Sequence, residues 1–217
     1  MQASWTTNLR GKFLVFEGPD GSGKTTQMRR LHAVLAADGI PVLEVREPGG
    51  TAIGEQVRQI LLHTKAEMTL RCEMLLYMAS RAQLVEQRIR PALASGHTVL
   101  SDRYVQSTLA YQGAAGGLPG SDISAVARVA TQNLQPDLVV IFDLDETAAA
   151  KRLSPLLDRM EAKGAAFHRK VRQGYLDLAR GDPSRYAVID AGKDPETVWR
   201  SLCETMAERA ATLPARR

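Results

Sequence analysis

The sequence lacks several features that would place it in a specialised class of proteins. It contains only 2 cysteines in 217 residues. Cys72 and Cys203 do not have the spacing of metal ligands, so neither a disulfide scaffold nor a zinc site is indicated. No apolar run approaches the roughly 20 residues that cross a bilayer, and the start of the chain contains no segment typical of a signal peptide. These absences predict a cytoplasmic protein without a membrane partner.

Aromatic residues are few, and the chain has no strong imbalance of charge. Aromatics make up 5% of the chain, and the formal net charge is only +4. Nucleic-acid-binding surfaces combine a dense basic stripe with interleaved aromatic rings, so we predict no nucleic acid partner. The modest positive charge suits small phosphorylated molecules instead. The guanine-reading motif [NT]-K-x-D is absent as well, which disfavours a GTPase switch.

The chain does contain apolar, β-branched runs that alternate with segments of helical periodicity. Its 44% hydrophobic content supports a substantial core. This alternation favours an α/β fold in which about five parallel strands carry helices on both faces. The runs that predict strands are residues 13–16, 41–45, 98–100, 138–142 and 186–189.

The chain shows no linker that would divide it into independent domains. We therefore expect one domain over residues 12–213, preceded by a flexible segment over residues 1–11 and followed by a tail over residues 214–217. The longest helical pattern covers residues 70–90 and should bend or end near Pro91, because proline disrupts helical hydrogen bonding.

The most informative stretch is a glycine-rich segment between the first predicted strand and the helix that follows. Gly18–Thr25 (GPDGSGKT) matches the pattern G-x-x-x-x-G-K-[ST] at every fixed position. In this context the backbone N–H groups cradle phosphates, Lys24 reaches the terminal phosphates and the Thr25 hydroxyl binds Mg²⁺. The segment predicts a three-layer P-loop NTPase fold. The residues expected to hold ATP are Gly18, Pro19, Asp20, Gly21, Ser22, Gly23, Lys24, Thr25 and Thr26.

A second segment with phosphate chemistry follows the strand predicted at residues 98–100. Asp102 stands where an acid can hold Mg²⁺ opposite Thr25, although it could instead cap the next helix. Arg103 follows directly, and a planar guanidinium suits bidentate phosphate binding. Arg46 and Arg58 add further positive charge near strand ends, as phosphoryl transfer requires, although Arg58 could equally belong to a solvated helix face.

Two groups of side chains with helical spacing predict a pocket for a nucleobase. Tyr77 and Arg81 are four residues apart, so they share one helix face. Thr108, Tyr111 and Gln112 share a face in the same way. An aromatic ring beside a guanidinium can stack on a base and hydrogen-bond its edge.

Taken together, three motifs in the chain resemble those of bacterial thymidylate kinases. They are FEGPDGSGKTT at Phe16–Thr26, REPGGT at Arg46–Thr51 and DRYVQSTLAYQ at Asp102–Gln112. The resemblance extends from about residue 12 to residue 213. It implies ATP-dependent phosphorylation of dTMP to dTDP by direct in-line transfer, with Mg²⁺, in a homodimer.

The resemblance also implies roles for residues on the acceptor side. Tyr77, in place of the usual phenylalanine, would stack on thymine, and Arg81 would hydrogen-bond its O4 edge. Arg58 and Arg103 would clamp the acceptor phosphate, while Tyr111 would lie under the deoxyribose. The implied dTMP-binding set is Asp20, Glu47, Arg58, Tyr77, Arg81, Arg103, Thr108, Tyr111 and Gln112.

The implied catalytic residues are Lys24, Asp20, Arg103 and Arg159, with Thr25 and Asp102 at the metal. Asp20 resembles the acid that bacterial members carry in the P-loop, near the acceptor's 3′-hydroxyl or the metal. Such members often place arginines in a lid, here a short one at about residues 154–165. Of the two candidates, Arg152 and Arg159, we expect Arg159 to supply the lid cation, because DRME at Asp158–Glu161 matches the family pattern.

Three other interpretations stay open at this point. The acceptor could be another pyrimidine nucleotide or nucleoside, or the chain could bind nucleotides without turnover as a regulator. The segment from Asp143 to Thr147 also matches the D-x-D-x-T motif of haloacid-dehalogenase-like phosphatases, in which the first aspartate is a nucleophile. A late position in the chain disfavours that assignment.

Overall fold

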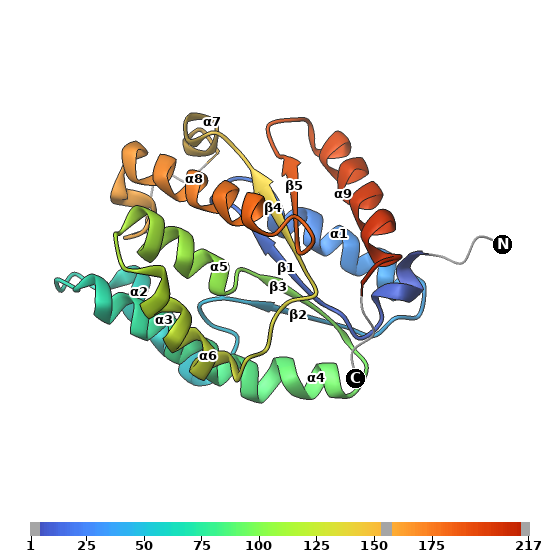
Figure 1. Ribbon diagram of the computed structural model, residues 1–217, viewed down its shortest axis with the longest axis horizontal. Helices are drawn as coiled ribbons and strands as arrows, with labels where there is room; N and C mark the ends of the chain where they lie inside the picture. Colours follow the sequence, from blue (N-terminus) through green and yellow to red (C-terminus); the bar gives the residue numbers. More distant parts are fainter. Residues whose placement is uncertain (1–4, 153–157, 214–217) are drawn as a thin grey trace.

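A computed structural model describes residues 5–152 and 158–213 of the 217. The predicted segments 1–4, 154–157 and 214–217 lie outside these residues. Five strands form one parallel sheet in the order β2-β3-β1-β4-β5 (Figure 1). This confirms the α/β prediction, and each strand coincides with one of the apolar runs. The strands are β1 (Phe13–Glu17), β2 (Val42–Arg46), β3 (Thr98–Asp102), β4 (Leu138–Asp143) and β5 (Tyr186–Asp190).

The helices form a layer on each face of this sheet, because the strands are apolar on both faces. One layer contains α1 and α9, whose apolar sides pack on residues such as Phe16 and Phe142. The other layer contains α3 and α8, which pack on the opposite side chains of the same strands, such as Val15 and Ile141. The helices are α1 (Lys24–Ala37), α2 (Ala52–His63), α3 (Leu70–Leu84), α4 (Arg90–Ala94), α5 (Val105–Thr108), α6 (Gly120–Thr131), α7 (Glu146–Ala150), α8 (Ala165–Gly181) and α9 (Pro195–Ala210).

The register of the sheet brings the predicted phosphate-handling segments to one edge. Phe16 of β1 lies beside Asp102 of β3, and Asp102 lies beside Arg46 of β2. Because the strands are parallel, the loops that leave their carboxyl ends meet above the same edge, which is where open α/β sheets bind ligands. The P-loop, Asp102 and the REPGGT segment are therefore neighbours.

The helix predicted over residues 70–90 changes its winding near Pro91 but does not end there. A π-helical turn, η2 (Val85–Ile89), joins α3 to α4. The N–H of Arg90 bonds the carbonyl of Val85, five residues back. Proline has no N–H and its ring crowds the preceding turn, so the wider turn before Pro91 lets the chain remain helical as far as Ala94.

Residues close to the N-terminus are packed rather than flexible, contrary to our expectation for residues 5–11. Trp5–Leu9 forms a 3₁₀ helix, η1. Leu9 is fully buried in the core layer of α1 and α9, and its carbonyl accepts a hydrogen bond from Thr98 Oγ1 at 2.8 Å. Burial of an apolar side chain stabilises this segment.

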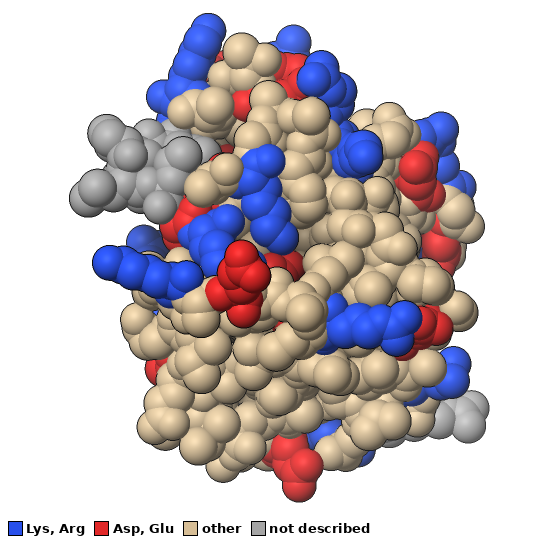
Figure 2. Space-filling view, turned by 90° about the vertical axis from the view of Figure 1, so that its left-hand side faces the viewer, with Lys and Arg blue, Asp and Glu red and all other residues tan. Residues whose placement is uncertain are grey.

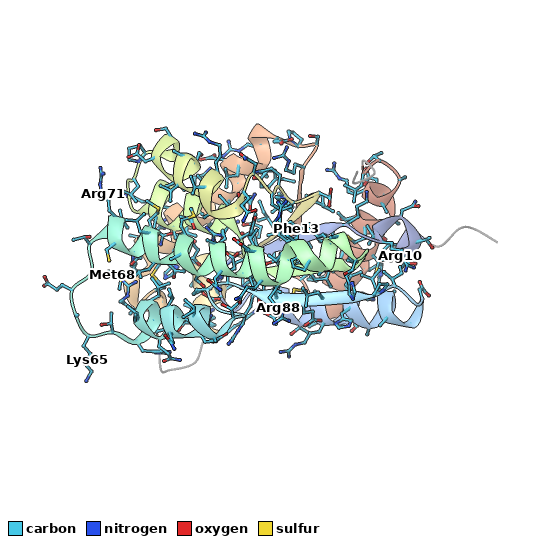
Figure 3. The ribbon with its side chains drawn as sticks, turned by 90° about the horizontal axis from the view of Figure 1, so that it is seen from below. Arg10, Phe13, Lys65, Met68, Arg71 and Arg88 are labelled. Atoms are coloured by element: carbon cyan, nitrogen blue, oxygen red, sulfur yellow. The ribbon has the colours of Figure 1, made fainter. Side chains whose placement is uncertain are left out.

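Figure 3 shows Arg10 at the opposite end of the molecule from Lys65, Met68 and Arg71, which surround the α2–α3 connection.

Within the described chain, no helix combines the length and the hydrophobicity needed to cross a membrane.

Candidate active site

The P-loop turns tightly between β1 and the start of α1. Gly18 has a φ of 138° and Gly23 a φ of 80°, values that glycine adopts readily and other residues rarely do. A Cβ at Gly18 would lie 2.5 Å from the carbonyl oxygen of Phe142, so only glycine allows this approach to β4. The first turn of α1 has neither an acidic residue nor a side-chain cap. Its N–H groups and positive dipole end are therefore available to an anion.

Lys24, Thr25 and Asp102 meet as the sequence predicted. Thr25 Oγ1 donates a hydrogen bond to Asp102 Oδ2 at 2.6 Å. Lys24 Nζ lies 3.8 Å from Asp102 Oδ1 and 3.3 Å from Asp20 Oδ1. No group of three or more His, Cys, Asp or Glu residues that could hold a metal is found in the described ranges. A hydroxyl and one carboxylate suit Mg²⁺, which usually keeps water and substrate phosphates as its other ligands.

Arg103 links the P-loop to the acceptor side. Its Nη2 donates to Asp20 Oδ1 at 2.8 Å, and its Nη1 lies 3.2 Å from both Ser107 Oγ and the Tyr175 hydroxyl. Burial alone would raise the pKa of Asp20, but the charges of Arg103 and Lys24 outweigh it and hold that pKa below its ordinary value. Asp20 is therefore an ionised acid that fixes two cations.

A buried glutamate that the sequence analysis missed supports this arrangement. Glu17, the last residue of β1, is fully buried and accepts hydrogen bonds from Ser107 Oγ at 2.6 Å and Tyr175 OH at 2.8 Å. Burial raises the pKa of Glu17 even though Arg103 and these donors oppose the shift. Its position in the sequence could have indicated this role. An acid that ends a buried strand beside a P-loop needs a buried partner.

Lys24, Thr25 and Asp102 line a cleft. The predicted acceptor residues meet in one cavity beside this cleft, with the exception of Arg81. Tyr77 comes from α3, Thr108 from α5, and Tyr111 and Gln112 from the π-helical segment η3 (Leu109–Ala115). η3 packs closely on α8, where a Cβ at Gly174 would lie 2.7 Å from that of Ala114. The residues that line the cavity are Asp20, Glu47, Pro48, Arg58, Leu62, Tyr77, Arg103, Ser107, Thr108, Tyr111, Gln112, Asp158, Met160 and Glu161.

Arg81 lies behind the cavity wall, with 1% of its surface exposed. Its Nε donates to Glu47 Oε2 at 2.7 Å, and its Nη2 donates to the Tyr104 carbonyl at 2.9 Å. Its Nη1 contacts Thr108 Oγ1 at 3.2 Å and the sulfur of Met78 at 3.0 Å. The guanidinium therefore holds two cavity residues in place, Glu47 and Thr108.

Glu47 gives the protein a testable dependence on pH. Burial raises the pKa of Glu47 to about 7 although Arg81 opposes the shift, and its Oε1 has no hydrogen-bond partner. The folded protein therefore keeps a proton that the unfolded chain releases near pH 4.5, so stability falls as pH rises from about 4.5 to 7. We expect the free energy of unfolding of the wild type, relative to Glu47→Gln, to fall by about 3 kcal/mol across this range. Urea denaturation of both proteins at several pH values measures it. A constant difference across the range would contradict the assignment.

Of the two arginines considered for the lid, the one that we expected to supply its cation does not lie at the P-loop. Arg159, predicted as the cation over the transferred phosphate, instead has its Nη1 2.6 Å from Glu73 Oε2 and donates from Nε to the Leu61 carbonyl at 2.7 Å. A buried carboxylate attracts this guanidinium toward α2 and α3. Arg152 lies at the P-loop, where its Nη1 contacts the carbonyls of Gly21 and Ala191 at 3.3 and 3.2 Å.

A further pocket lies on the other side of the P-loop and includes residues that the sequence analysis did not select. The β5–α9 connection forms one wall of it and Arg152 joins the P-loop on the other. This connection leaves the same edge of the sheet as the P-loop, so the order of strands and helices could have indicated that its residues line a pocket there. The lining residues are Gly21, Ser22, Gly23, Thr26, Gln27, Arg152, Ala191, Gly192, Lys193, Asp194, Pro195 and Val198.

The D-x-D-x-T segment has structural partners instead of a free nucleophile. Both carboxylate oxygens of Asp143 accept hydrogen bonds from Arg172, at 2.6 and 2.8 Å. Asp145 caps α7 through the N–H groups of Thr147 and Ala148. The geometry therefore disfavours the phosphatase interpretation.

A P-loop, an acid at the end of the neighbouring strand and an adjoining cationic cavity define a P-loop phosphotransferase. A family model described as "Thymidylate kinase" matches residues 16–202. The chain is 49% identical to a thymidylate kinase of Desulforudis audaxviator over 208 aligned residues. The alignment covers 93% of this chain and 94% of the relative. The chain is 46% identical over 204 residues to one of Deinococcus radiodurans (92% and 98%) and 44% identical over 206 residues to one of Bifidobacterium longum (93% and 100%). The chain belongs to the thymidylate kinase family.

Proposed function

We propose that the protein transfers the γ-phosphoryl group of ATP to dTMP, which yields dTDP and ADP. One observation supports this proposal above the others. The cleft with Lys24, Thr25 and Asp102 and the acceptor cavity share four lining residues, Asp20, Glu47, Arg58 and Arg103. An acceptor held in the cavity thus has its phosphate at the P-loop end, where the donor's terminal phosphate is bound.

The cavity walls suggest how dTMP lies. The ring of Tyr77 stacks on thymine, and Gln112 and Thr108 face the base edge, with Arg81 Nη1 behind Thr108. Tyr111 forms a wall under the deoxyribose and stays neutral, since burial raises its pKa to about 12. Arg58 and Arg103 hold the acceptor phosphate through charge-assisted hydrogen bonds, and Asp20 orients Arg103.

The chemistry needs alignment and charge rather than a general base. An oxygen of the dTMP phosphate is already anionic near neutral pH, so it attacks the γ-phosphorus of ATP directly. The bond from that phosphorus to the β–γ bridging oxygen breaks, and ADP leaves with the electron pair. Lys24, Arg58 and Arg103 stabilise the negative charge on the transferred group.

We propose that Thr25 and Asp102 hold Mg²⁺ together with the nucleotide. The hydroxyl and carboxylate lie within hydrogen-bond distance of each other, which is the pair that P-loop proteins use for this ion. When bound, Mg²⁺ neutralises charge on the phosphate oxygens. Arg152 and the β5–α9 connection supply the space for the rest of ATP.

A panel of acceptors tests the proposed reaction. ADP release in a coupled assay with dTMP, dUMP, dCMP, UMP and thymidine should give the highest kcat/KM for dTMP and require Mg²⁺. A higher kcat/KM for UMP or thymidine would show a different acceptor. Binding of ATP without any turnover would indicate a regulator.

We also propose a homodimer formed through α2, α3 and α6. Large apolar side chains lie exposed on these helices, including Ile53, Ile60, Leu75 and Val129, the last of which is 80% exposed. Figure 2 shows few charged side chains in the lower half of this side, at the level where Figure 1 places α3 and α6. Exposed apolar patches of this kind often form interfaces between subunits.

Replacing Leu75 with arginine should convert the dimer to a monomer, because the charge would be buried at the interface. Light scattering after size exclusion should give about twice the mass of one chain for the wild type and one chain for the variant. Val188→Arg, at a residue on β5 that is 47% exposed, is the matched control and should remain dimeric. A monomeric wild type would contradict the proposal.

A cytoplasmic location is part of the proposal. The reaction consumes ATP, and Cys72 and Cys203 carry free thiols, as is usual in reducing compartments.

A further inference from the structure

A buried carboxylate next to the acceptor cavity has no role in the reaction described above. Glu73, on α3, is 1% exposed. It accepts a hydrogen bond from Gln112 Nε2 at 2.7 Å. Arg159 Nη1 lies 2.6 Å from its Oε2, and Lys163 Nζ lies 3.2 and 3.3 Å from its two oxygens. Two cations from the segment before α8 thus converge on one acid, which contacts one residue of the cavity.

The surroundings of Glu73 keep it ionised. Burial favours the neutral acid, but the hydrogen bond from Gln112 and the charges of Lys163 and Arg159 outweigh it and lower the pKa of Glu73. An ionised carboxylate only accepts hydrogen bonds. The two ends of a side-chain amide are told apart by their hydrogen-bond partners. The end of the Gln112 amide that faces Glu73 must therefore be its NH₂ group.

The orientation of this amide decides which group the cavity presents to a base. With the NH₂ group committed to Glu73, the carbonyl oxygen of Gln112 remains for the cavity that Gln112 lines. An oxygen there accepts a hydrogen bond from a ring nitrogen that carries hydrogen, as N3 of thymine does. It repels the lone pair that cytosine has at the same position.

We propose that Glu73 is a positioning residue that turns the Gln112 carbonyl oxygen toward the nucleobase, so that the enzyme selects pyrimidines with a hydrogen on N3. The proposal rests on the proposed function, since it takes the cavity as the site of the acceptor base. Arg159 and Lys163 serve it by keeping Glu73 charged and in place.

The variant Glu73→Gln tests the proposal with a change of one atom. Arg159 and Lys163 can only donate hydrogen bonds, so the new carbonyl oxygen should turn to them and the new NH₂ group to Gln112. Gln112 must then accept from residue 73, and its own NH₂ group turns into the cavity. We expect kcat/KM for dTMP to fall about 30-fold, mainly through KM, and the preference for dTMP over dCMP to fall by more than that factor.

A second substitution should rescue this variant if orientation is the cause. In Glu73→Gln/Gln112→Glu, the carboxylate at 112 accepts from the amide at 73 with one oxygen and presents the other to the base. We expect the double variant to regain at least about tenfold in kcat/KM for dTMP over Glu73→Gln. Gln112→Glu alone should be poor, because two carboxylates would then face each other.

A matched control exists in η2, the π-helical turn that follows α3. Gln132 Nε2 donates to Glu86 Oε2 at 3.0 Å on the surface, so Glu86→Gln alters a similar pair outside the cavity and should leave base preference unchanged. Should Glu73→Gln fail to fold, as a thermal melt would report, the double variant decides alone. Retained preference for dTMP then supports the proposal, and lost preference overturns it.

The outcomes separate this inference from the proposed function. Unchanged base preference in folded Glu73→Gln, or no rescue by the second substitution, overturns the positioning role and leaves the dTMP kinase assignment intact. If Gln112→Leu leaves KM for dTMP unchanged, the cavity is not the base site, and the proposed acceptor placement fails with it.

Discussion

Replacement of Lys24 with alanine should lower kcat for dTMP phosphorylation by about 10³-fold. Lys24 is 5% exposed, and its Nζ lies between Asp20 and Asp102 at 3.3 and 3.8 Å. At this position the ammonium stabilises charge that develops on the transferred phosphoryl group. A factor of 10³ corresponds to about 4 kcal/mol of transition-state stabilisation.

The loss should appear in kcat more than in the binding of the acceptor. Lys24 lines the cleft but not the acceptor cavity, so the dissociation constant for dTMP, measured by calorimetry, should change by less than about threefold. Lys170→Ala removes an exposed lysine of α8 and is the control, with kcat expected within about twofold of the wild type. Undiminished turnover in Lys24→Ala would rule out the phosphate-cradle role of Gly18–Thr25.

Much of the fold could be predicted from local sequence patterns, because neighbouring residues largely determine whether a segment forms a strand or a helix. A run such as Leu138–Phe142 is apolar on both faces, which suits a strand covered by helices on two sides. Parallel strands place their carboxyl ends at one edge. The predicted proximity of Asp102 to Thr25, whose Oδ2 and Oγ1 lie 2.6 Å apart, therefore follows from the parallel sheet and the two motifs.

Side-chain pairs that form only when the helices and strands pack together could not be predicted from the sequence. Nothing in the spacing of Arg159 indicates that a buried glutamate, 86 residues earlier in the chain, attracts it away from the P-loop. The burial of Arg81 has the same origin, since Glu47 and the Tyr104 carbonyl become its neighbours only in the folded sheet. Helical periodicity also cannot reveal π-helical turns such as Leu109–Ala115, which depend on one hydrogen bond shifted by a residue.

The second large effect is expected at Arg103, where lysine should not substitute for arginine. Arg103 lines both the cleft and the cavity. Its two terminal nitrogens face Asp20 on one side and Ser107 with Tyr175 on the other. The guanidinium also lies over the ring of Tyr111, 5.3 Å from its centroid. A lysine ammonium is a point charge that cannot span these partners in one plane and still bind a phosphate.

We expect Arg103→Lys to lower kcat by about 10³-fold and to raise KM for dTMP as well, since the acceptor phosphate loses a bidentate partner. Steady-state kinetics with both substrates varied separates the two effects. Arg172→Lys is the matched control, because Arg172 makes a two-point contact with Asp143 outside the cleft and its replacement should change kcat by less than about threefold. If Arg103→Lys kept wild-type kcat, a single positive charge would suffice at this position. The fixed plane that Asp20, Ser107 and Tyr175 give the guanidinium would then have no part in catalysis.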